Sequence, residues 1–486
     1  MSIERKFQMK VYNLLYKFIN VFFGVLILRT VKTKYAIAIM KRIKLDVRYC
    51  WNFDRLYFLN KNKSNFTSNF LQLYYLVSPV GYGLSWGCAM ESAYRIINIA
   101  YSKIYKNKNT IKYVEREKHF ILNNLELHSN NNHIFFNIIG VLIANKISGN
   151  FTDDEKWKLA FINECQSQFN DDGTNFEAST NYHLVMMEAI CHLINVRPEY
   201  LSLVKEYINI PGAIRFVNYI ETNDGILLIG DNDDGMCIKN NTNEIKNRKS
   251  QIDFIKNTFS SSFDDKLPSS FAFKDFGVFF YRHKNCSISL WNPSSGQKGK
   301  SGHNHNDNHS ICCVIEDKEF LIDPGVFYYS LKREYFRSEA NHSTIISNKA
   351  GFNKFTGRFA RSSDADCDLF YFNNKVKTKL HREGLMSDRS IELKENSFKV
   401  YDSIEVNEKL YTCLILSEFV SITKLKDGIL LSRNDCSKKV YIKSECYDDI
   451  LIEDVLISPC YGEVSVSNKV VLGSSKNTLT WEIILV

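Results

Sequence analysis

The hydrophobic pattern of this chain changes its period near residue 265, and no other feature constrains the fold as strongly. From about residue 66 to 260 apolar side chains recur every three or four positions, as Trp86, Met90 and Ala93 do, which is typical of helices that bury one face. After about residue 270 apolar and polar residues alternate and turn residues interrupt them at short intervals, which is typical of antiparallel strands. The sequence therefore predicts helices followed by an antiparallel β-sandwich.

We predict three domains from this pattern. Residues 1–50 form an N-terminal helical extension, residues 51–265 a helical domain and residues 266–486 the β-sandwich. Short polar loops such as "NDDGTN" between the helices suit antiparallel helix pairs in a bundle or a toroid. With only 7 Pro and no long Gly/Ser-rich linker, the domains are expected to abut.

Composition excludes some classes of protein. The 486 residues carry a net charge of +8 without a dense Lys/Arg block, which indicates a solvated surface, with attraction to a polyanion as the alternative. No zinc-finger or RNA-recognition pattern is present, so nucleic acid is not an expected partner. The 13 cysteines include no CxxC pair, which favours small buried thiols in a reducing compartment over a disulfide framework.

The N-terminal segment contains an apolar run, Val21–Leu28, that is too short to cross a bilayer. It leads into "RTVKTK" instead of a small-residue cleavage site. We predict an uncleaved helix that packs on the protein or associates peripherally with a membrane, and a signal peptide or anchor is the alternative. The sequence leaves the oligomeric state open.

The segment "GHNHNDNHS", residues 302–310, holds the densest group of histidines in the chain. A hairpin predicted from Ser310 to Asp323 begins and ends at the same edge, so His305 and Asp323 are expected to be neighbours. His342 is a candidate third ligand if its segment returns to that edge, and such a set suits zinc. The alternative is a polar loop whose histidines bind no metal, and we assign His309 to the following strand.

Four further places hold candidate site residues. Tyr182 begins an apolar helix and is either a proton donor in a cleft or an ordinary amphipathic side chain. Glu177 and Asp172 precede it as a candidate acid pair. Asn132 and His133 begin another apolar helix, where Asn132 is either the N-cap or part of a carboxylate-binding site. The run "LLIGDNDDG" is interpreted as a buried structural turn, with a calcium site as the alternative, although its spacing fits no EF-hand calcium loop.

Taken in order, six segments resemble the heparinase II/III family of polysaccharide lyases. They are "WGCAMESAYRIIN", "NNHIFFNIIGVLIA", "DDGTNFEASTNYH", "LIGDNDDG", "GHNHNDNHSICCVIEDKEFLIDPGVFYY" and "YFRSEANHSTI", which extend from about residue 51 to 345, whereas the first 50 residues match poorly. The resemblance implies an (α/α) toroid followed by an antiparallel β-sandwich. It also implies β-elimination in an acidic polysaccharide that contains uronic acid.

The resemblance implies roles for individual residues. Asn132 and His133 would neutralise the uronate carboxylate, which makes the C5 proton easier to remove. Tyr182 would be the acid and in some stereochemistries also the base, and His303 the partner base. The remaining assignments are His305, Asp323 and His342 as ligands of a structural zinc ion, and Arg337 and Glu177 as contacts to the acidic sugar.

Two other functions stay open at this point. One is a glycan-binding or assembly protein of a polysaccharide biosynthesis system, which keeps the fold and the metal without turnover. The other is a glycoside hydrolase that uses a carboxylate pair such as Asp172 and Glu177. The resemblance implies a cell-envelope or periplasmic location, whereas the cysteines and the absence of a clear signal peptide favour the cytoplasm.

Overall fold

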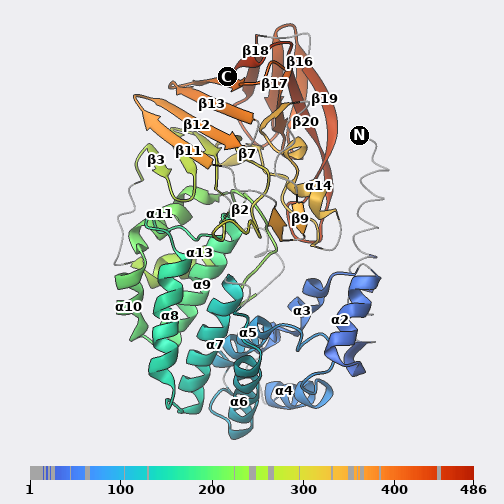
Figure 1. Ribbon diagram of the computed structural model, residues 1–486, viewed down its shortest axis with the longest axis vertical. Coiled ribbons are helices and arrows are strands. Elements are labelled where there is room, and N and C mark those ends of the chain that lie inside the picture. Colours follow the sequence, from blue (N-terminus) through green and yellow to red (C-terminus); the bar gives the residue numbers. More distant parts are fainter. Residues whose placement is uncertain are drawn as a thin grey trace.

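The computed structural model stacks a helical half and a β-sheet half along the longest axis of the molecule (Figure 1). The structure describes residues 15, 18–19, 22, 28–43, 45–60, 66–102, 104–127, 131–223, 225–239, 248–260, 267–294, 296–329, 332–347, 355–357, 359–361, 366–382, 385–445 and 450–486. The predicted fold class, a helical (α/α) toroid followed by an antiparallel β-sandwich, is confirmed. The apolar run Val21–Leu28 lies outside the described residues except for Phe22 and Leu28.

The helical half consists of α-helices joined mostly by short loops. They are α2 (Thr33–Arg42), α3 (Val47–Asp54), α4 (Phe66–Val77), α5 (Ala89–Ala100), α6 (Lys108–Asn123), α7 (Asn132–Ser148), α8 (Asp154–Gln168), α9 (Thr180–Val196), α10 (Tyr200–Tyr207), α11 (Ile210–Ile220) and α13 (Lys249–Thr258). Short 3-10 turns cover Leu28–Thr30 and Tyr57–Asn60, and a two-residue hairpin pairs β1 (Glu221–Thr222) with β2 (Gly225–Ile226).

Helices α5 and α7 form the centre of this half. The prediction that α5 buries a single face is wrong: every residue from Ala89 to Ile99 is buried, because neighbouring helices cover it from several sides. Trp86 precedes the helix. Gly140 allows the close approach of α7 to α5, since a Cβ there would lie 2.7 Å from the Ala93 Cβ.

The second half consists of antiparallel sheets. The five-stranded sheet contains β3 (Ser270–Phe273), β4 (Val278–His283), β5 (Cys286–Trp291), β6 (Ser310–Ile315) and β7 (Lys318–Leu321) in that order. The eight-stranded sheet has the order β11 (Asp366–Phe372), β12 (Lys375–Arg382), β13 (Leu385–Leu393), β14 (Ser397–Ile404), β21 (Thr478–Leu485), β18 (Val440–Ser444), β17 (Gly428–Ser432) and β16 (Ser421–Leu425). A four-stranded sheet has the order β19 (Ile450–Ile457), β20 (Ser465–Ser474), β15 (Leu410–Ile415) and β8 (Ile345–Ser347), and β9 (Phe355–Gly357) pairs with β10 (Ala360–Arg361).

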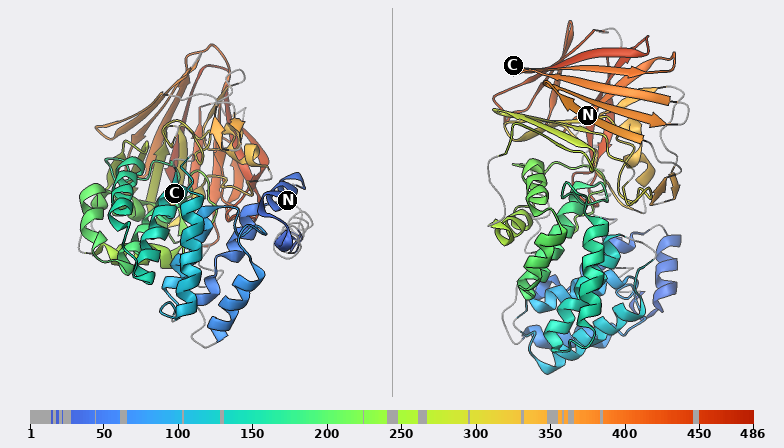
Figure 2. Two further views of the ribbon diagram at one scale, coloured as in Figure 1. Left: turned by 60° about the horizontal axis from the view of Figure 1, so that its bottom comes forward. Right: turned by 60° about the vertical axis from the view of Figure 1, so that its left-hand side comes forward.

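The five-stranded sheet is the layer that joins the two halves. Its alternate side chains belong to different cores: Val278, Phe280 and Cys312 pack with the helices, whereas Phe279 and Cys313 pack inside the sandwich. Both faces of β6 are therefore buried, which explains its continuous apolar run. The views in Figure 2 show the sheets seated on one end of the helical half.

Two predicted domain limits, at residues 50 and 265, can be compared with the observed elements. Helix α3 passes through residue 50, so the limit predicted there falls inside a helix. The limit predicted at residue 265 lies outside the described residues, between the end of α13 at Thr258 and the start of β3 at Ser270. The twelve cysteines in the described part of the chain are free thiols, and most of them are buried.

Candidate active site and metal centre

A cavity of about 990 Å³ lies where the helices meet the loops of the sandwich. Four of the predicted site residues line it: Asn132, His133, Tyr182 and His303. The first three come from helices of the N-terminal half and His303 from the loop before β6. Residues separated by up to 171 positions in sequence therefore face one space, large enough for several sugar units.

Asn132 is the first residue of α7, and the N-cap is Asn131, whose side chain accepts a hydrogen bond from the His133 backbone N–H. The prediction that Asn132 could be the cap is therefore off by one residue. The backbone N–H of Asn132 donates to Glu177 Oε1 at 2.7 Å, and its side-chain amide lies 3.4 Å from Glu177 Oε2. The buried Glu177 carboxylate therefore holds the start of α7, where the helix dipole favours a negative charge.

His133 is paired with Glu126, which sequence reasoning did not single out. Its Nδ1 lies 2.8 Å from Glu126 Oε1, and Glu126 also accepts hydrogen bonds from the Met90 backbone N–H and the Asn137 amide. Burial opposes a charge on either partner, but their hydrogen bond outweighs it: the pKa of Glu126 is lowered to about 2 and the pKa of His133 is raised. The geometry favours an imidazolium at the cavity wall.

Tyr182 presents its hydroxyl to a second carboxylate. Helix α9 begins at Thr180 with Ser179 as its N-cap, which places Tyr182 in the first turn. The Tyr182 hydroxyl donates to Asp233 Oδ2 at 2.7 Å and lies 3.0 Å from the Tyr329 hydroxyl. Two phenols and one carboxylate thus form a hydrogen-bonded group at the cavity, which can hold or transfer a proton.

His303 stacks on Tyr182. The ring centroids are 3.8 Å apart and the planes differ by 21°. His303 Nδ1 lies 2.9 Å from Asp231 Oδ2, whereas Nε2 is 3.5 Å from Glu177 Oε2, too long for a good hydrogen bond. Asp231 therefore orients the ring and leaves Nε2 as the nitrogen that can reach a ligand.

Asp231 connects this part of the site to the metal centre. It accepts two hydrogen bonds from the Arg333 guanidinium, at 2.8 and 2.7 Å, and its Oδ1 lies 3.2 Å from His305 Nε2. Burial disfavours the carboxylate charge, but Arg333 and the two imidazoles hold the pKa of Asp231 well below its usual range. One buried carboxylate thus contacts both His303 and His305.

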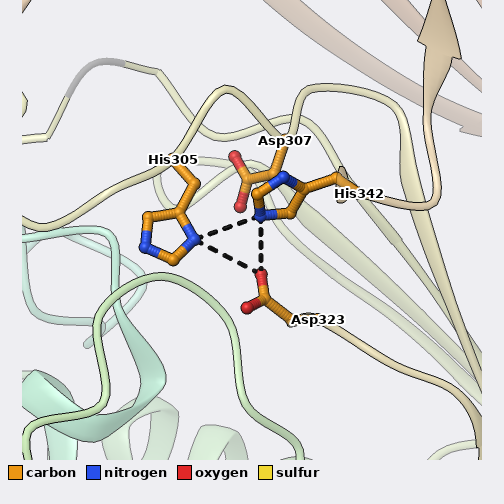
Figure 3. Close-up of side chains that lie close together, drawn as sticks. All are labelled: His305, Asp307, Asp323 and His342. Carbon is orange, nitrogen blue, oxygen red and sulfur yellow. Dashed lines mark hydrogen bonds and ion pairs between the residues drawn. The ribbon is translucent and has the colours of Figure 1, made fainter. Parts of the chain in front are cut away.

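His305, Asp323 and His342 converge on one point, as Figure 3 shows. His305 Nδ1 lies 3.1 Å from His342 Nε2 and 3.7 Å from Asp323 Oδ2, and His342 Nε2 lies 3.3 Å from the same oxygen. Ligands bound tetrahedrally at zinc distances are separated by about 3.3 Å, so these three atoms fit a zinc ion. Asp307 lies within the same buried group.

The second nitrogen of each histidine supports this interpretation. His305 Nε2 faces Asp231, and His342 Nδ1 lies 2.7 Å from the Ser338 carbonyl oxygen. Metal-bound histidines commonly direct their other nitrogen to such a carboxylate or carbonyl, which fixes the ring. Burial lowers the pKa of His305, but the carboxylates of Asp323 and Asp231 outweigh it and raise the pKa to about 9, so a metal ion must displace a proton there.

The two predicted sugar contacts lie behind the cavity. The Arg337 guanidinium is buried and donates to the carbonyl oxygens of Ser301 and Asn304, which shapes the loop that carries His303. Glu177 is fully buried and contacts Asn132 and His303. Neither lines the cavity, so the structure places both residues beside groups that do, and their contact with the sugar stays a prediction.

Asp172 also lies outside the cavity lining. Its carboxylate accepts hydrogen bonds from Thr174 and from the Asp275 backbone N–H. Asp172 and Glu177 therefore do not face the cavity together, and this pair does not support the hydrolase hypothesis. His309, assigned to a strand, lies just before β6, and burial lowers its pKa to about 3.

Sequence reasoning missed several residues of the site. Asp231 and Asp233 belong to "LIGDNDDG", which was interpreted as a structural turn, and Tyr329 and Arg333 follow the Asp-Pro-Gly turn. The pattern that could have found the aspartates is an acidic run that directly follows a buried apolar run, because carboxylates at such a place need cationic partners. No comparable pattern marks Arg333.

Two parts of the chain match models of known protein families. Residues 105–210 match the family model described as heparinase II/III N-terminus, and residues 265–478 match the model described as heparinase II/III-like, C-terminal. Together they cover about two thirds of the chain. This protein belongs to the heparinase II/III family. No curated protein matches its sequence.

Solved structures of heparinases share the fold of this heparinase II/III family member. A crystal structure of heparinase III has a TM-score of 0.61 at 14% identity, covering 82% of this chain and 69% of its own. The heparan sulfate lyase HepC from Pedobacter heparinus has a TM-score of 0.59 at 19% identity, and the match covers 82% of this chain and 68% of the HepC chain. A HepC mutant has a TM-score of 0.60 at 17% identity, and the match covers 90% of this chain and 77% of the mutant chain. At these identities the likeness establishes the fold.

Proposed function

We propose that this protein is a polysaccharide lyase that cleaves a polysaccharide containing uronic acid by β-elimination. The observation that carries the proposal is the convergence of Asn132, His133, Tyr182 and His303 on one cavity. Such a reaction needs a group that neutralises the carboxylate next to C5, a base for the C5 proton and an acid for the departing glycosidic oxygen. The four residues supply these three functions.

The carboxylate of the sugar binds at the start of α7. His133 lines the cavity at this point, and its hydrogen bond with Glu126 raises its pKa, which favours the positively charged imidazolium. Asn132 lines the cavity, and its Oδ1 is buried without a hydrogen-bond partner among the described residues. Lys41, Lys300 and Lys332 also line the cavity, which favours an acidic polymer.

The protons move on the side of the sugar that faces the Tyr182–His303 stack. The Tyr182 hydroxyl gives its proton to the departing oxygen, and His303 Nε2 takes the C5 proton while Asp231 holds Nδ1. The products are a new reducing end and a sugar with a double bond between C4 and C5. No water is consumed, which distinguishes the reaction from hydrolysis.

We propose that His305, Asp323 and His342 hold zinc. Their contacting atoms have tetrahedral spacing and the site is buried. The ion has a structural role: it fixes the loop before β6 to the segments that follow β7 and α14 (Arg333–Arg337). His303, two residues from His305, is thereby held at the cavity. We also propose a role in the metabolism of a surface polysaccharide.

The test compares Tyr182→Phe with the unchanged protein on a panel of glycans, including heparan sulfate, chondroitin sulfate, alginate and hyaluronan. The expected result is ultraviolet absorbance from the unsaturated product with the unchanged protein, and a loss of about a thousandfold or more in the variant with glycan binding retained. Tyr200→Phe is the matched control, because the buried Tyr200 hydroxyl has no hydrogen-bond partner among the described residues.

Two outcomes would contradict the proposal. Glycan binding without any unsaturated product across the panel would identify a binding or assembly protein. Cleavage with incorporation of oxygen from labelled water and without a double bond would identify a hydrolase.

A further inference from the structure

The positive charge of the chain is concentrated at its N-terminal end. Eleven of the 62 Lys and Arg residues and two of the 54 Asp and Glu residues lie within residues 1–50. This segment therefore carries a net charge of +9, against +8 for the whole chain, and residues 51–486 carry −1. A positive charge that is confined to one segment indicates that this segment binds an acidic partner. It does not indicate a basic surface over the whole protein.

The same end of the protein exposes apolar side chains. Thirteen of the 25 exposed large hydrophobic residues in the described part of the chain lie between residues 15 and 82. On α2 and its C-cap they form a stripe at four-residue spacing, Tyr35, Ile39 and Ile43, next to the exposed Lys34 and Arg42. Helix α2 contains no acidic residue. It therefore has the composition of a helix that lies in a membrane interface.

Helix α4 and the loop after it extend this exposed apolar surface. Leu73, Leu76 and Val77 on α4 and Val80 in the loop are exposed, with Leu76 at 76%. No charged residue occurs from position 66 to 90, which is unusual for a helix at a water-facing surface. In a monomer surrounded by water, such a surface marks an interaction site.

The loop after α4 lies next to the start of α2. The Thr33 N–H donates to the Gly81 carbonyl oxygen at 2.9 Å, and the Gly83 N–H donates to the Val31 carbonyl oxygen at 2.8 Å. These hydrogen bonds join the loop after α4 to the start of α2, and both helices lie at the lower right of Figure 1. Apolar and basic side chains thus meet on one corner of the molecule.

We propose that this corner, formed by the outer faces of α2 and α4, docks the protein on a membrane that contains anionic lipids. Stable peripheral binding needs two contributions, insertion of apolar side chains and attraction between basic residues and acidic headgroups, and the corner supplies both. No helix in the described part of the chain is long and apolar enough to cross a membrane, so the proposed mode is docking at the surface.

The docking corner lies directly behind one wall of the cavity. Ile37 and Lys41 on the opposite side of α2 line the cavity. A docked protein would therefore hold its cavity close to the lipid surface, within reach of a glycan chain that starts at the membrane. The docking proposal rests on exposure and charge and is independent of the lyase activity.

The experiment measures flotation of the full-length protein with two kinds of vesicle. One contains phosphatidylcholine alone and the other equal amounts of phosphatidylcholine and phosphatidylglycerol. Two double variants separate the apolar contribution to binding from the electrostatic one. Leu73→Ser with Leu76→Ser removes exposed apolar groups, and Lys34→Glu with Arg42→Glu reverses two charges. Leu451→Ser with Ile452→Ser, two exposed residues of β19, is the matched control.

The expected result is binding to the anionic vesicles that weakens with salt, is reduced at least about tenfold in both double variants and is unchanged in the control. Unchanged melting temperatures would show that the variants fold. Absence of binding to anionic vesicles, or equal binding by all variants, would overturn the proposal. Self-association of the unchanged protein that the same variants abolish would also overturn it, because the corner would then be an interface between two copies.

Discussion

Asp231 lies 2.9 Å from His303 Nδ1, and its other oxygen lies 3.2 Å from His305 Nε2. A single carboxylate therefore connects the residue proposed to move a proton with a residue proposed to bind zinc. This contact connects the geometry of the cavity with the proposed metal ligands, and it is the basis of the first prediction.

Replacing Asp231 with Asn should abolish most activity and destabilise the protein by about 3–5 kcal/mol, because Arg333 would lose its buried partner. The measurements are the free energy of unfolding and the initial rate of the folded fraction. Asp402→Asn is the matched control, since Asp402 pairs with the buried Arg389 inside the sandwich. Asp402→Asn should lower the free energy of unfolding by a similar amount and leave the initial rate unchanged. Equal rates in the two variants would contradict a positioning role for Asp231.

Replacing Glu126 with Gln should weaken substrate binding at high pH. The Glu126 carboxylate raises the pKa of His133, so its loss lowers that pKa, and the imidazolium disappears at a lower pH than in the unchanged protein. KM should then begin to rise at a lower pH, by about tenfold on the alkaline side, with a smaller effect on kcat.

The control for this pH profile is Glu164→Gln, which removes a carboxylate that contacts Gln168 on α8, outside the cavity lining. It should leave the profile of KM against pH unchanged. If Glu126→Gln also leaves the profile in place, His133 does not carry the charge that binds the substrate.

Replacing His342 with Ala should remove bound zinc. The unchanged protein is expected to contain about one zinc ion per chain, and zinc at a hundred times its dissociation constant should stabilise it by about 2.7 kcal/mol. His342→Ala should show neither the metal in elemental analysis nor the zinc-dependent rise in melting temperature. His283→Ala, at a histidine paired with Glu395 on the surface, should retain both. Full zinc content in His342→Ala would exclude the proposed ligand set.

Replacing Gly230 with Ala should disturb the active site through the backbone. Gly230 has a φ of +71°, and a Cβ there would lie 2.8 Å from the His303 carbonyl oxygen. Gly149→Ala is the control, because Gly149 has a φ of +70° with nothing within 4 Å of the added Cβ. Both variants carry the backbone strain, of about 1 kcal/mol, but only Gly230→Ala should also lower kcat. Equal effects on kcat would show that the clash with His303 is relieved elsewhere.

Much of the fold could be predicted from the sequence because helices and strands impose different hydrophobic periods. The hairpin predicted from Ser310 to Asp323 is observed as β6 and β7; it begins at Ser310 as predicted and ends at Leu321, two residues early. Helix α5 was less predictable. It is buried on all sides, and the spacing of Trp86 and Met90 suggested one buried face because a pattern of apolar residues does not show how many neighbours a helix has.

The site was predictable where its members are close in sequence or joined by a hairpin, as His305 and Asp323 are. Asp231 and Arg333 could not be found in this way, because only the tertiary structure brings their loops together. The surroundings of Arg337 could not be predicted for a related reason: sequence shows that an arginine is present but not that its guanidinium donates to backbone carbonyls. The N-cap of α7 was off by one residue, an ordinary error where two asparagines are adjacent.

Helix α2 has the cavity on one side, through Ile37 and Lys41, and the proposed lipid-facing stripe on the other. Two ligands that contact opposite sides of one helix are thermodynamically linked whenever either of them shifts it. Linkage is reciprocal, so if attachment to a bilayer changes the affinity for glycan by some factor, glycan must change the partition onto the bilayer by the same factor. Such a protein would bind the glycan and the bilayer either cooperatively or competitively. Measuring the coupling factor for one ligand would give it for the other as well.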